Sequence, residues 1–430
     1  MSRFRYPVDT GQFALIREKD LVYVDKTDLM FDLVNRYNYV FLARPRRFGK
    51  SMLCNTFKAY FQGKKELFEG LKIMDLEKEW KKYPVLYFKF SQMSIFSELN
   101  NLNQISMIDE YSGLCGITQE ELDTVLRPCV EEYASNLEMT TDEAYALLKE
   151  KYDGYHFARK SQDIYAPFSL MRALNNNTTD NFWFESGTSA SLIEHLKHFP
   201  NFNPLDFDGV EVSLEDFNVP CENASTPVPM LYQSGYLTIA SYDKLLDSYT
   251  LHFPNYEVRQ GMIYSLTNYL MDISDWDRNA TILEMARALV KGDLPSALTE
   301  LRSYIASLPY DIITRKEWMA KKKKEAFYKL LMYVVFSLLN SKVDTEVKSV
   351  LGRADVVIKT KNDIYVLELK VDDTVDNALS QIDSKGYAIP YEADGRQLTK
   401  CGVTISSEAR NIVHWRAVDN DGKVINEQKF

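Results

Sequence analysis

Cysteine is scarce in this chain, and its few cysteines form no pattern. Five of them are scattered over 430 residues, without a CxxC pair and without the spacing of a zinc site. Their odd number also argues against a framework of disulfides. The sequence therefore favours a reducing, cytoplasmic setting.

Long hydrophobic runs are missing as well. The first residues, Met1 to Pro7, contain no apolar signal core, and the longest apolar stretch covers only residues 330–339. A helix needs about 20 apolar residues to cross a bilayer. We therefore expect no membrane insertion, and the chain has neither an internal repeat nor a low-complexity tract.

An excess of positive charge is also absent, because the formal net charge is −10. Any contact with nucleic acid must then use local basic patches. Hydrophobic residues make up 45% and charged residues 26%, which is ordinary for a globular protein. The length is enough for two or three domains.

The first motif is a basic loop that ends in Gly49-Lys50-Ser51. It follows an apolar run at 39–43, expected to be a buried strand, and precedes a helical pattern at 52–61. This is the context of a phosphate-binding loop, in which Lys50 reaches the phosphates and the Ser51 hydroxyl ligates Mg²⁺. The loop begins with Arg44 where the P-loop pattern has a glycine, so a basic surface turn is the alternative.

The acidic partner that an ATPase needs is hard to find. The expected strand at 85–90 ends without a carboxylate. Asp109-Glu110 resembles the acidic end of a metal-binding strand, but the residues before it are too polar for a buried strand. We expect a loop there, leading to a helix that Thr118 caps.

Other elements are predicted more coarsely. Helices are expected at 120–135 and 141–152, the second with Thr141 as N-cap, and mainly helices at 257–305. Strands are expected at 182–188, 230–239 and 249–253. His156 is a lone histidine among aromatic residues, and we expect it to pack rather than to act in catalysis.

The second motif consists of two apolar runs, 352–358 and 364–370, around a polar turn at 360–363. A hairpin with this turn pairs 359 with 364 and 357 with 366, and so brings Asp355 opposite Glu368, roughly 5 Å apart at Cβ. Lys370 shares the face of Glu368, because side chains alternate along a strand. The conflict between two facing carboxylates would be resolved by Mg²⁺.

The order of elements around this hairpin is α-β-β-β-α-β. A lysine run, 321–324, opens an apolar helix at 325–339, and three expected strands (343–350, 354–359, 364–370), a helix (376–387) and a strand (400–405) complete this order. A last strand is expected at 412–417. The composition changes near residue 310. We therefore predict two α/β domains, 1–310 with a P-loop and a helical extension, and 311–430.

The C-terminal part resembles the PD-(D/E)xK nuclease superfamily, on Asp355 and, thirteen positions later, Glu368-Leu369-Lys370. This resemblance implies a restriction-endonuclease-like fold, with Asp355 and Glu368 as metal ligands and Lys370 as a catalytic residue. Glu325 and Gln381 match accessory positions often seen in such nucleases.

The N-terminal part is similar to the AAA-ATPase-like domain joined to this nuclease domain in bacterial, notably Bacteroides-type, proteins. The similarity is carried by residues 23–27, 44–51, 151–157 and 232–237. Such relatives carry a long insert after the strand at 85–90, with the Walker B element. Here the segment is missing, so ATP hydrolysis is doubtful even if nucleotide binds at Arg46, Arg47, Gly49, Lys50 and Ser51.

The leading hypothesis is a Mg²⁺- or Mn²⁺-dependent nuclease acting on DNA, coupled to a domain that binds a nucleoside triphosphate such as ATP. Two alternatives remain open. One is a nucleotide-binding switch or DNA-binding module with an inactive nuclease fold, and the other is an active ATPase. The sequence leaves oligomerisation open.

Overall fold

A computed structural model describes residues 3–88, 102–184, 196, 199, 208–219, 224–262, 275–307, 328, 331–332, 335, 346–348 and 356–430. The chain divides into two compact units, each continuous in space but not in sequence. Unit 1 contains residues 1–188 and 206–261, and unit 2 contains residues 189–205 and 262–430. None of the described helices is both long enough and apolar enough to cross a bilayer.

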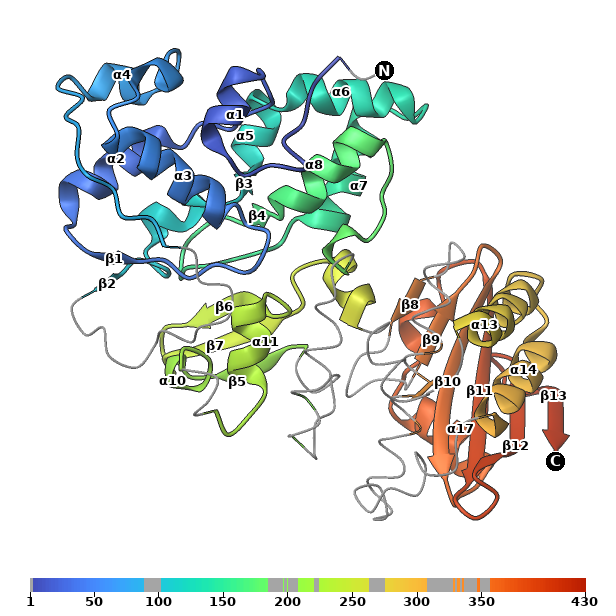
Figure 1. Cartoon of the computed structure of the whole chain (residues 1–430). Coiled ribbons are helices and arrows are strands. Elements are labelled where there is room, and N and C mark those ends of the chain that lie inside the picture. The colour runs from blue at the N-terminus through green and yellow to red at the C-terminus, as the bar shows by residue number, and fades with distance from the viewer. Residues whose placement is uncertain are drawn as a thin grey trace. The chain divides into compact units, whose positions relative to one another are not determined.

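Unit 1 is mainly helical, with short strands between the helices (Figure 1). Its elements are α1 Phe13–Glu18, α2 Thr27–Arg36, β1 Val40–Phe41, α3 Lys50–Phe61, η1 Lys65–Phe68, α4 Ile73–Leu76, β2 Asn103–Gln104, η2 Asp109–Leu114, β3 Ile117–Thr118, α5 Gln119–Thr124, α6 Arg127–Asn136, α7 Thr141–Tyr152, β4 Ile164–Tyr165, α8 Pro167–Asn176, η3 Phe182–Phe184, β5 Val210–Val212, α10 Leu214–Phe217, α11 Val228–Ser234, β6 Thr238–Asp243 and β7 Ser248–His252.

Several predicted strands of unit 1 are wrong. The strand expected at 39–43 shrinks to the two residues of β1, which pair in parallel with β2 alone among the described strands. Residues 85–88 form no strand, and Leu86 and Phe88 are exposed. Residues 182–184 form the 3-10 helix η3.

The strand expected at 230–239 begins as helix α11 instead, and only β6 remains of it. Pro229 stands in the first turn of α11, where the missing N–H costs nothing, and Gly235 ends the helix in the left-handed region. The strand expected at 249–253 is confirmed as β7.

Helix caps follow local chemistry. Thr118 caps α5 with a capping box, as predicted, because its hydroxyl accepts from the Glu121 amide while the Glu121 carboxylate accepts from the Thr118 amide. The N-cap of α7 is Thr140 and not Thr141, since only Thr140 has a glutamate, Glu143, three positions later.

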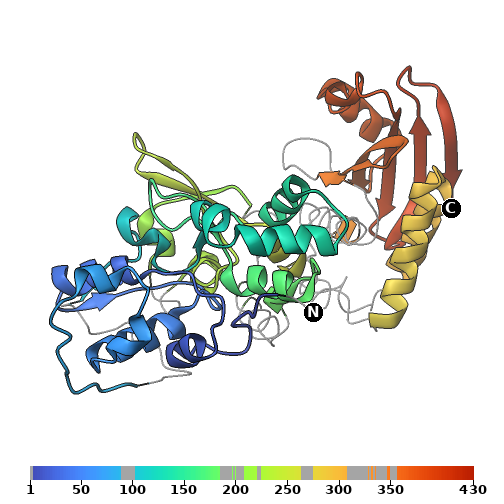
Figure 2. The same ribbon diagram turned by 90° about the horizontal axis from the view of Figure 1, so that it is seen from above.

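Unit 2 is a six-stranded sheet between helices (Figures 1 and 2). Its elements are α13 Asp275–Val290, α14 Leu294–Ala306, β8 Glu346–Lys348, β9 Val356–Lys359, β10 Asp363–Val371, α17 Val375–Ser384, η7 Ile389–Tyr391, β11 Gln397–Ser406, β12 Asn411–Val418 and β13 Val424–Lys429. The strand order is β13-β12-β11-β10-β9-β8, with β10 and β11 parallel and the other pairs antiparallel.

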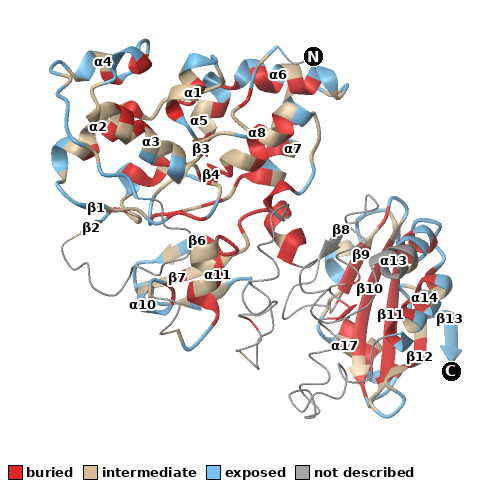
Figure 3. Ribbon diagram, viewed as in Figure 1, coloured by how far each residue is buried: buried red, intermediate tan, exposed pale blue. Residues whose placement is uncertain are grey.

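The two faces of this sheet carry different helices. Alternate residues of β10, among them Tyr365, Leu367 and Leu369, join the core with α13 and α14. The other face, with Ile364 and Val366, packs under α17. The central strands β10 and β11 are the most buried part of the unit (Figure 3).

The predicted order of strands and helix from β8 to β12 is confirmed. Most of the first helix, predicted at 325–339, lies outside the described residues, as does the predicted domain boundary at 310/311, which stays a prediction. The edge strand β13 was not predicted.

Candidate functional site

The hairpin β9–β10 has the register that its sequence predicts. Ile364 faces Lys359 and Val366 faces Val357. The turn is held by the Thr360 amide, which donates to the Asp363 carbonyl at 2.8 Å, and by the Asp363 amide, which donates to the Thr360 hydroxyl at 3.0 Å. Arg396 also donates to the Thr360 carbonyl at 2.8 Å.

Glu368 and Lys370 lie on the face of β10 that α17 covers. Glu368 is fully buried, and the Lys370 ammonium donates to its carboxylate at 3.3 Å. The same ammonium donates to the Gln381 side-chain oxygen of α17 at 2.5 Å, and the Gln381 amide nitrogen lies 3.4 Å from the Tyr387 hydroxyl. The structure thus brings three of the five predicted catalytic residues together.

The other two predicted catalytic residues, Asp355 and Glu325, lie outside the described residues. Within the described part of the chain, no three His, Cys, Asp or Glu side chains cluster as a metal site. Carboxylate oxygens are the ligands that Mg²⁺ and Mn²⁺ prefer, so the chemistry of Asp355 and Glu368 fits such an ion.

A glycine sets the distance between α17 and the sheet. Gly402 of β11 lies beside Glu368 in the parallel register. A Cβ at this position would lie 2.8 Å from the Val375 carbonyl oxygen and 3.1 Å from the Ala378 methyl group. The absence of a side chain therefore allows α17 to approach closely enough for Gln381 to reach Lys370.

In unit 1, the basic loop leads into α3 through Gly49, which adopts a left-handed conformation with φ of 79°. The Lys50 ammonium turns back and donates to the carbonyls of Arg44 and Pro45, at 2.6 and 2.7 Å. Burial lowers the pKa of Lys50. Ser51 is exposed on the first turn of α3, as is Arg46 just before the helix.

Arg44, which replaces the first glycine of a P-loop, is structural. Its buried guanidinium donates to the carbonyls of Ala43, Ser106 and Tyr111 and lies 4.3 Å from the centre of the Phe157 ring. It therefore fastens the loop to η2 and to the aromatic turn after α7.

The side chain of Arg47 also contacts other parts of the protein. Its guanidinium donates to the Phe182 carbonyl and lies 4.2 Å from the centre of the Phe168 ring. Next to it, the fully buried Glu257 accepts from the Trp183 amide at 2.7 Å. Burial raises the pKa of Glu257 to about 7. No local pattern signals Glu257, because its partner lies 74 positions away.

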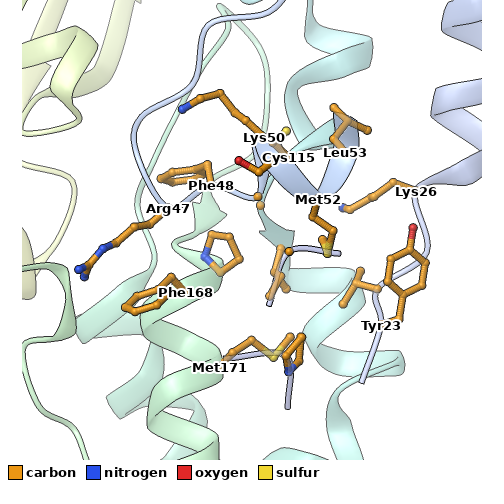
Figure 4. Close-up of a pocket in the computed structure, with 18 of the residues that line it drawn as sticks. Tyr23, Lys26, Arg47, Phe48, Lys50, Met52, Leu53, Cys115, Phe168 and Met171 are labelled. Carbon is orange, nitrogen blue, oxygen red and sulfur yellow. The ribbon is translucent and has the colours of Figure 1, made fainter. Parts of the chain in front are cut away.

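A pocket of about 380 Å³ lies beside this loop, within unit 1. Figure 4 shows Tyr23 and Lys26 on one side of it and Arg47 and Phe168 on the other. Lys50, Ser51 and the N-terminal residues 7–11 also line the pocket. The Lys26 ammonium forms an ion pair with Glu121 at 2.5 Å, which sequence reasoning missed because the partners are 95 positions apart.

Asp109 and Glu110 lie in η2 and are tied to neighbouring elements. The Asp109 carboxylate accepts from the Lys160 amide at 2.9 Å, and Glu110 forms an ion pair with Arg36 at 2.5 Å. The Nδ1 atom of His156 lies 3.2 Å from the Asp163 Oδ1 atom. The backbone amide of His156 donates to the Thr238 hydroxyl. These contacts link η2 and the turn after α7 to neighbouring elements of unit 1.

Comparisons with known proteins match two separate segments of the chain. Residues 7–170 match the family model of a predicted AAA-ATPase, AAA-ATPase-like, and residues 323–415 match that of the PD-(D/E)XK nuclease superfamily. The two matches lie in the order that the motifs of the sequence predict. No solved structure matches.

One curated relative is an uncharacterised protein in the vnfD 5′ region of Azotobacter chroococcum mcd 1. It is 26% identical over 528 aligned positions, which cover 96% of this chain and 98% of the relative. About 413 residues of this chain, 96% of 430, lie in the alignment of 528 positions. The remaining positions, about 115, are present in the relative and absent from this chain.

Proposed function

Because the chain joins an AAA-ATPase-like segment to a PD-(D/E)XK nuclease segment, we propose that it is a metal-dependent DNA nuclease with a nucleotide-binding domain. The observation that carries this proposal is the placement of Glu368. A fully buried carboxylate is costly unless it is paired, and here a lysine of the same strand lies 3.3 Å away under α17.

Asp355 and Glu368 would hold Mg²⁺ or Mn²⁺. When bound, the ion would supply a water of lowered pKa and neutralise charge on the scissile phosphate. Lys370 would orient that water or stabilise the negative charge that develops on the phosphate. Gln381 keeps the ammonium of Lys370 in place through the contact at 2.5 Å, and Glu325 would support the metal ligands.

The test is cleavage of single- and double-stranded DNA with Mg²⁺ or Mn²⁺, with and without ATP. We expect Glu368→Gln and Lys370→Ala to reduce cleavage at least a hundredfold, since each removes a group from the reacting centre. Lys429→Ala, on the exposed strand β13, is the matched control. Equal cleavage by the Lys370→Ala variant and the parent would refute the proposal.

The second candidate function is a nucleotide-binding switch without hydrolysis. Two observations favour it over an active ATPase. The parallel sheet beside the loop has only the two-residue strands β1 and β2 among the described strands, and the relative has about 115 additional positions. Both agree with the loss of a strand that would carry the acid of an ATPase.

The phosphate site of this switch would consist of Arg46, Gly49, Lys50 and Ser51, with Arg47 at its side. Binding requires Lys50 to leave the two loop carbonyls that it now contacts. Titration with ATP should give saturable binding that Lys50→Ala abolishes, without steady release of phosphate. Phosphate release that depends on Lys50 would instead establish an ATPase.

A further inference from the structure

Residues 208–252 form a small module of unit 1 that neither family match covers. Its described elements are β5, α10, α11 and the hairpin β6–β7, and its sheet has the order β5-β7-β6. Figure 1 shows these elements grouped together, in green and yellow-green. The corner between α11 and β6 is where this module meets the basic loop that ends in Gly49-Lys50-Ser51.

This corner is seated on Pro45 of the basic loop. Gly235, which ends α11, is buried and adopts a left-handed conformation with φ of 85°. A Cβ at Gly235 would lie 2.5 Å from the Pro45 Cβ, 3.0 Å from the Pro45 Cγ and 3.1 Å from the Trp183 ring. Only a residue without a side chain allows so close an approach. The proline ring therefore cannot shift toward the module unless the module moves as well.

Pro45 also carries one of the two carbonyls that hold Lys50. The Lys50 ammonium donates to the carbonyls of Arg44 and Pro45, at 2.6 and 2.7 Å, so both oxygens point at it. A phosphate-binding loop presents N–H groups to its ligand instead, so these peptide groups must turn before phosphate binds. The φ angle of proline is fixed, and no second rotation compensates when its carbonyl turns. The Pro45 ring must therefore shift, and the corner of the module lies against it.

The turn after α7 ties the same corner to the loop from another side. The fully buried Tyr155 donates from its hydroxyl to the Gly235 carbonyl at 2.9 Å, and its ring centre lies 4.7 Å from that of Phe48 in the loop. The His156 amide donates to the Thr238 hydroxyl at 2.8 Å, and this hydroxyl donates to the His156 carbonyl at 2.9 Å. The positions of the module and of the loop thus depend on one set of contacts.

We propose that the 208–252 module is a latch on the basic loop, which in its seated position holds Lys50 against the loop carbonyls and keeps phosphate out. The inference rests on the proposed function in one respect, that the loop binds a nucleoside triphosphate. Binding frees Lys50, shifts Pro45 and loosens the corner at Gly235. Because coupling between two sites is reciprocal, loosening the corner strengthens nucleotide binding by the same factor.

The first experiment titrates the full chain with ATP. Gly235→Ala forces a methyl group against Pro45 and should strengthen binding roughly tenfold, because the seated position has no room for it. Gly209→Ala, in the same module, is the matched control and should bind like the parent. Its φ of 98° is also left-handed, but an added Cβ meets no atom beyond its chain neighbours within 4 Å. As a second variant, Tyr155→Phe loses only the hydrogen bond to Gly235 and should strengthen binding about fivefold.

The second experiment measures hydrogen exchange in the same proteins. Saturating ATP should speed exchange in parent peptides that cover residues 228–240, which contain α11 and the start of β6. Without ATP, exchange in peptides that cover residues 44–53 should be roughly ten times faster in Gly235→Ala than in the parent, and unchanged in Gly209→Ala. The loop peptides therefore report the latch without any bound nucleotide.

Equal exchange of the loop peptides in the parent, Gly235→Ala and Tyr155→Phe would overturn the inference, whatever their affinity for ATP. So would a parent that binds ATP while neither variant binds it more tightly. The two proposals remain separable. If no protein binds ATP but the loop exchanges faster in both variants, nucleotide binding fails and the latch stands. If ATP binding depends on Lys50 but the loop is unchanged, the latch alone fails.

Discussion

Glu257 should make the stability of unit 1 depend on pH near neutrality. Burial raises the pKa of this carboxyl group from 4.5 to about 7, although the amides of Trp183 and Phe182, the Ser169 hydroxyl and Arg47 lower it. Lys151, Tyr152 and Tyr155 also interact electrostatically with the Glu257 carboxylate. The folded protein therefore holds this proton more tightly than the unfolded chain does.

The sign follows from this difference. The stabilisation is fully present below pH 4.5, where both states bind the proton, and it is lost as the pH rises through 7. A difference of about 2.5 pKa units corresponds to about 3 kcal/mol in all. Between pH 5 and 7.5, about 2 kcal/mol should be lost, roughly fiftyfold in the population of the open form.

Glu257→Gln removes the titration and keeps an oxygen for the Trp183 amide. Protection factors from hydrogen exchange, corrected for the intrinsic effect of pH, should be compared between parent and variant in peptides covering 182–184 and 256–262. The protection factor of the variant, divided by that of the parent, should rise roughly fiftyfold between pH 5 and 7.5. Glu211→Gln, at an exposed carboxylate of β5, is the control. Parallel pH curves for parent and Glu257→Gln would refute the reasoning.

Three further predictions concern the packing of a helix, a helix cap and a buried arginine. Gly402→Ala should push α17 from the sheet at a cost of about 1 to 3 kcal/mol, seen as faster hydrogen exchange in α17 with exchange in α7 unchanged. Thr140→Ala should cost about 1 kcal/mol and speed exchange at the start of α7, whereas an equal effect of Thr141→Ala would contradict the observed cap. Arg44→Lys keeps the charge but loses the forked donors, so its thermal midpoint should fall well below that of the exposed control Arg46→Lys; equal midpoints would show that the buried contacts of Arg44 add no stability.

The hairpin of unit 2 could be predicted from the sequence because its signals are local. Alternation with a period of two fixes which residues share a face, and the polar turn fixes the pairing. The alternation of side chains along the strand predicts that Lys370 shares the face of Glu368, and the resemblance to the nuclease superfamily points to Gln381. Asp355 and Glu325 remain predictions.

The short strands of unit 1 could not be predicted equally well. The apolar run around Leu231 suits a strand or a buried helix, and only Pro229 and Gly235 at its ends favour the helix. The run at 39–43 has the composition of a core strand, but β1 has only β2 beside it among the described strands. Strand length depends on neighbours that are distant in the sequence.

The four-residue turn between β9 and β10 has a consequence for how this chain can vary. Residues that face each other across the hairpin share a side of the sheet, so a slip of one residue in the pairing would move Val357 to the side opposite Val366. A slip of two residues would keep them on the same side. The hydrogen bonds of Thr360 and Arg396 hold the turn and thereby the register, on which the proposed pairing of Asp355 with Glu368 also depends.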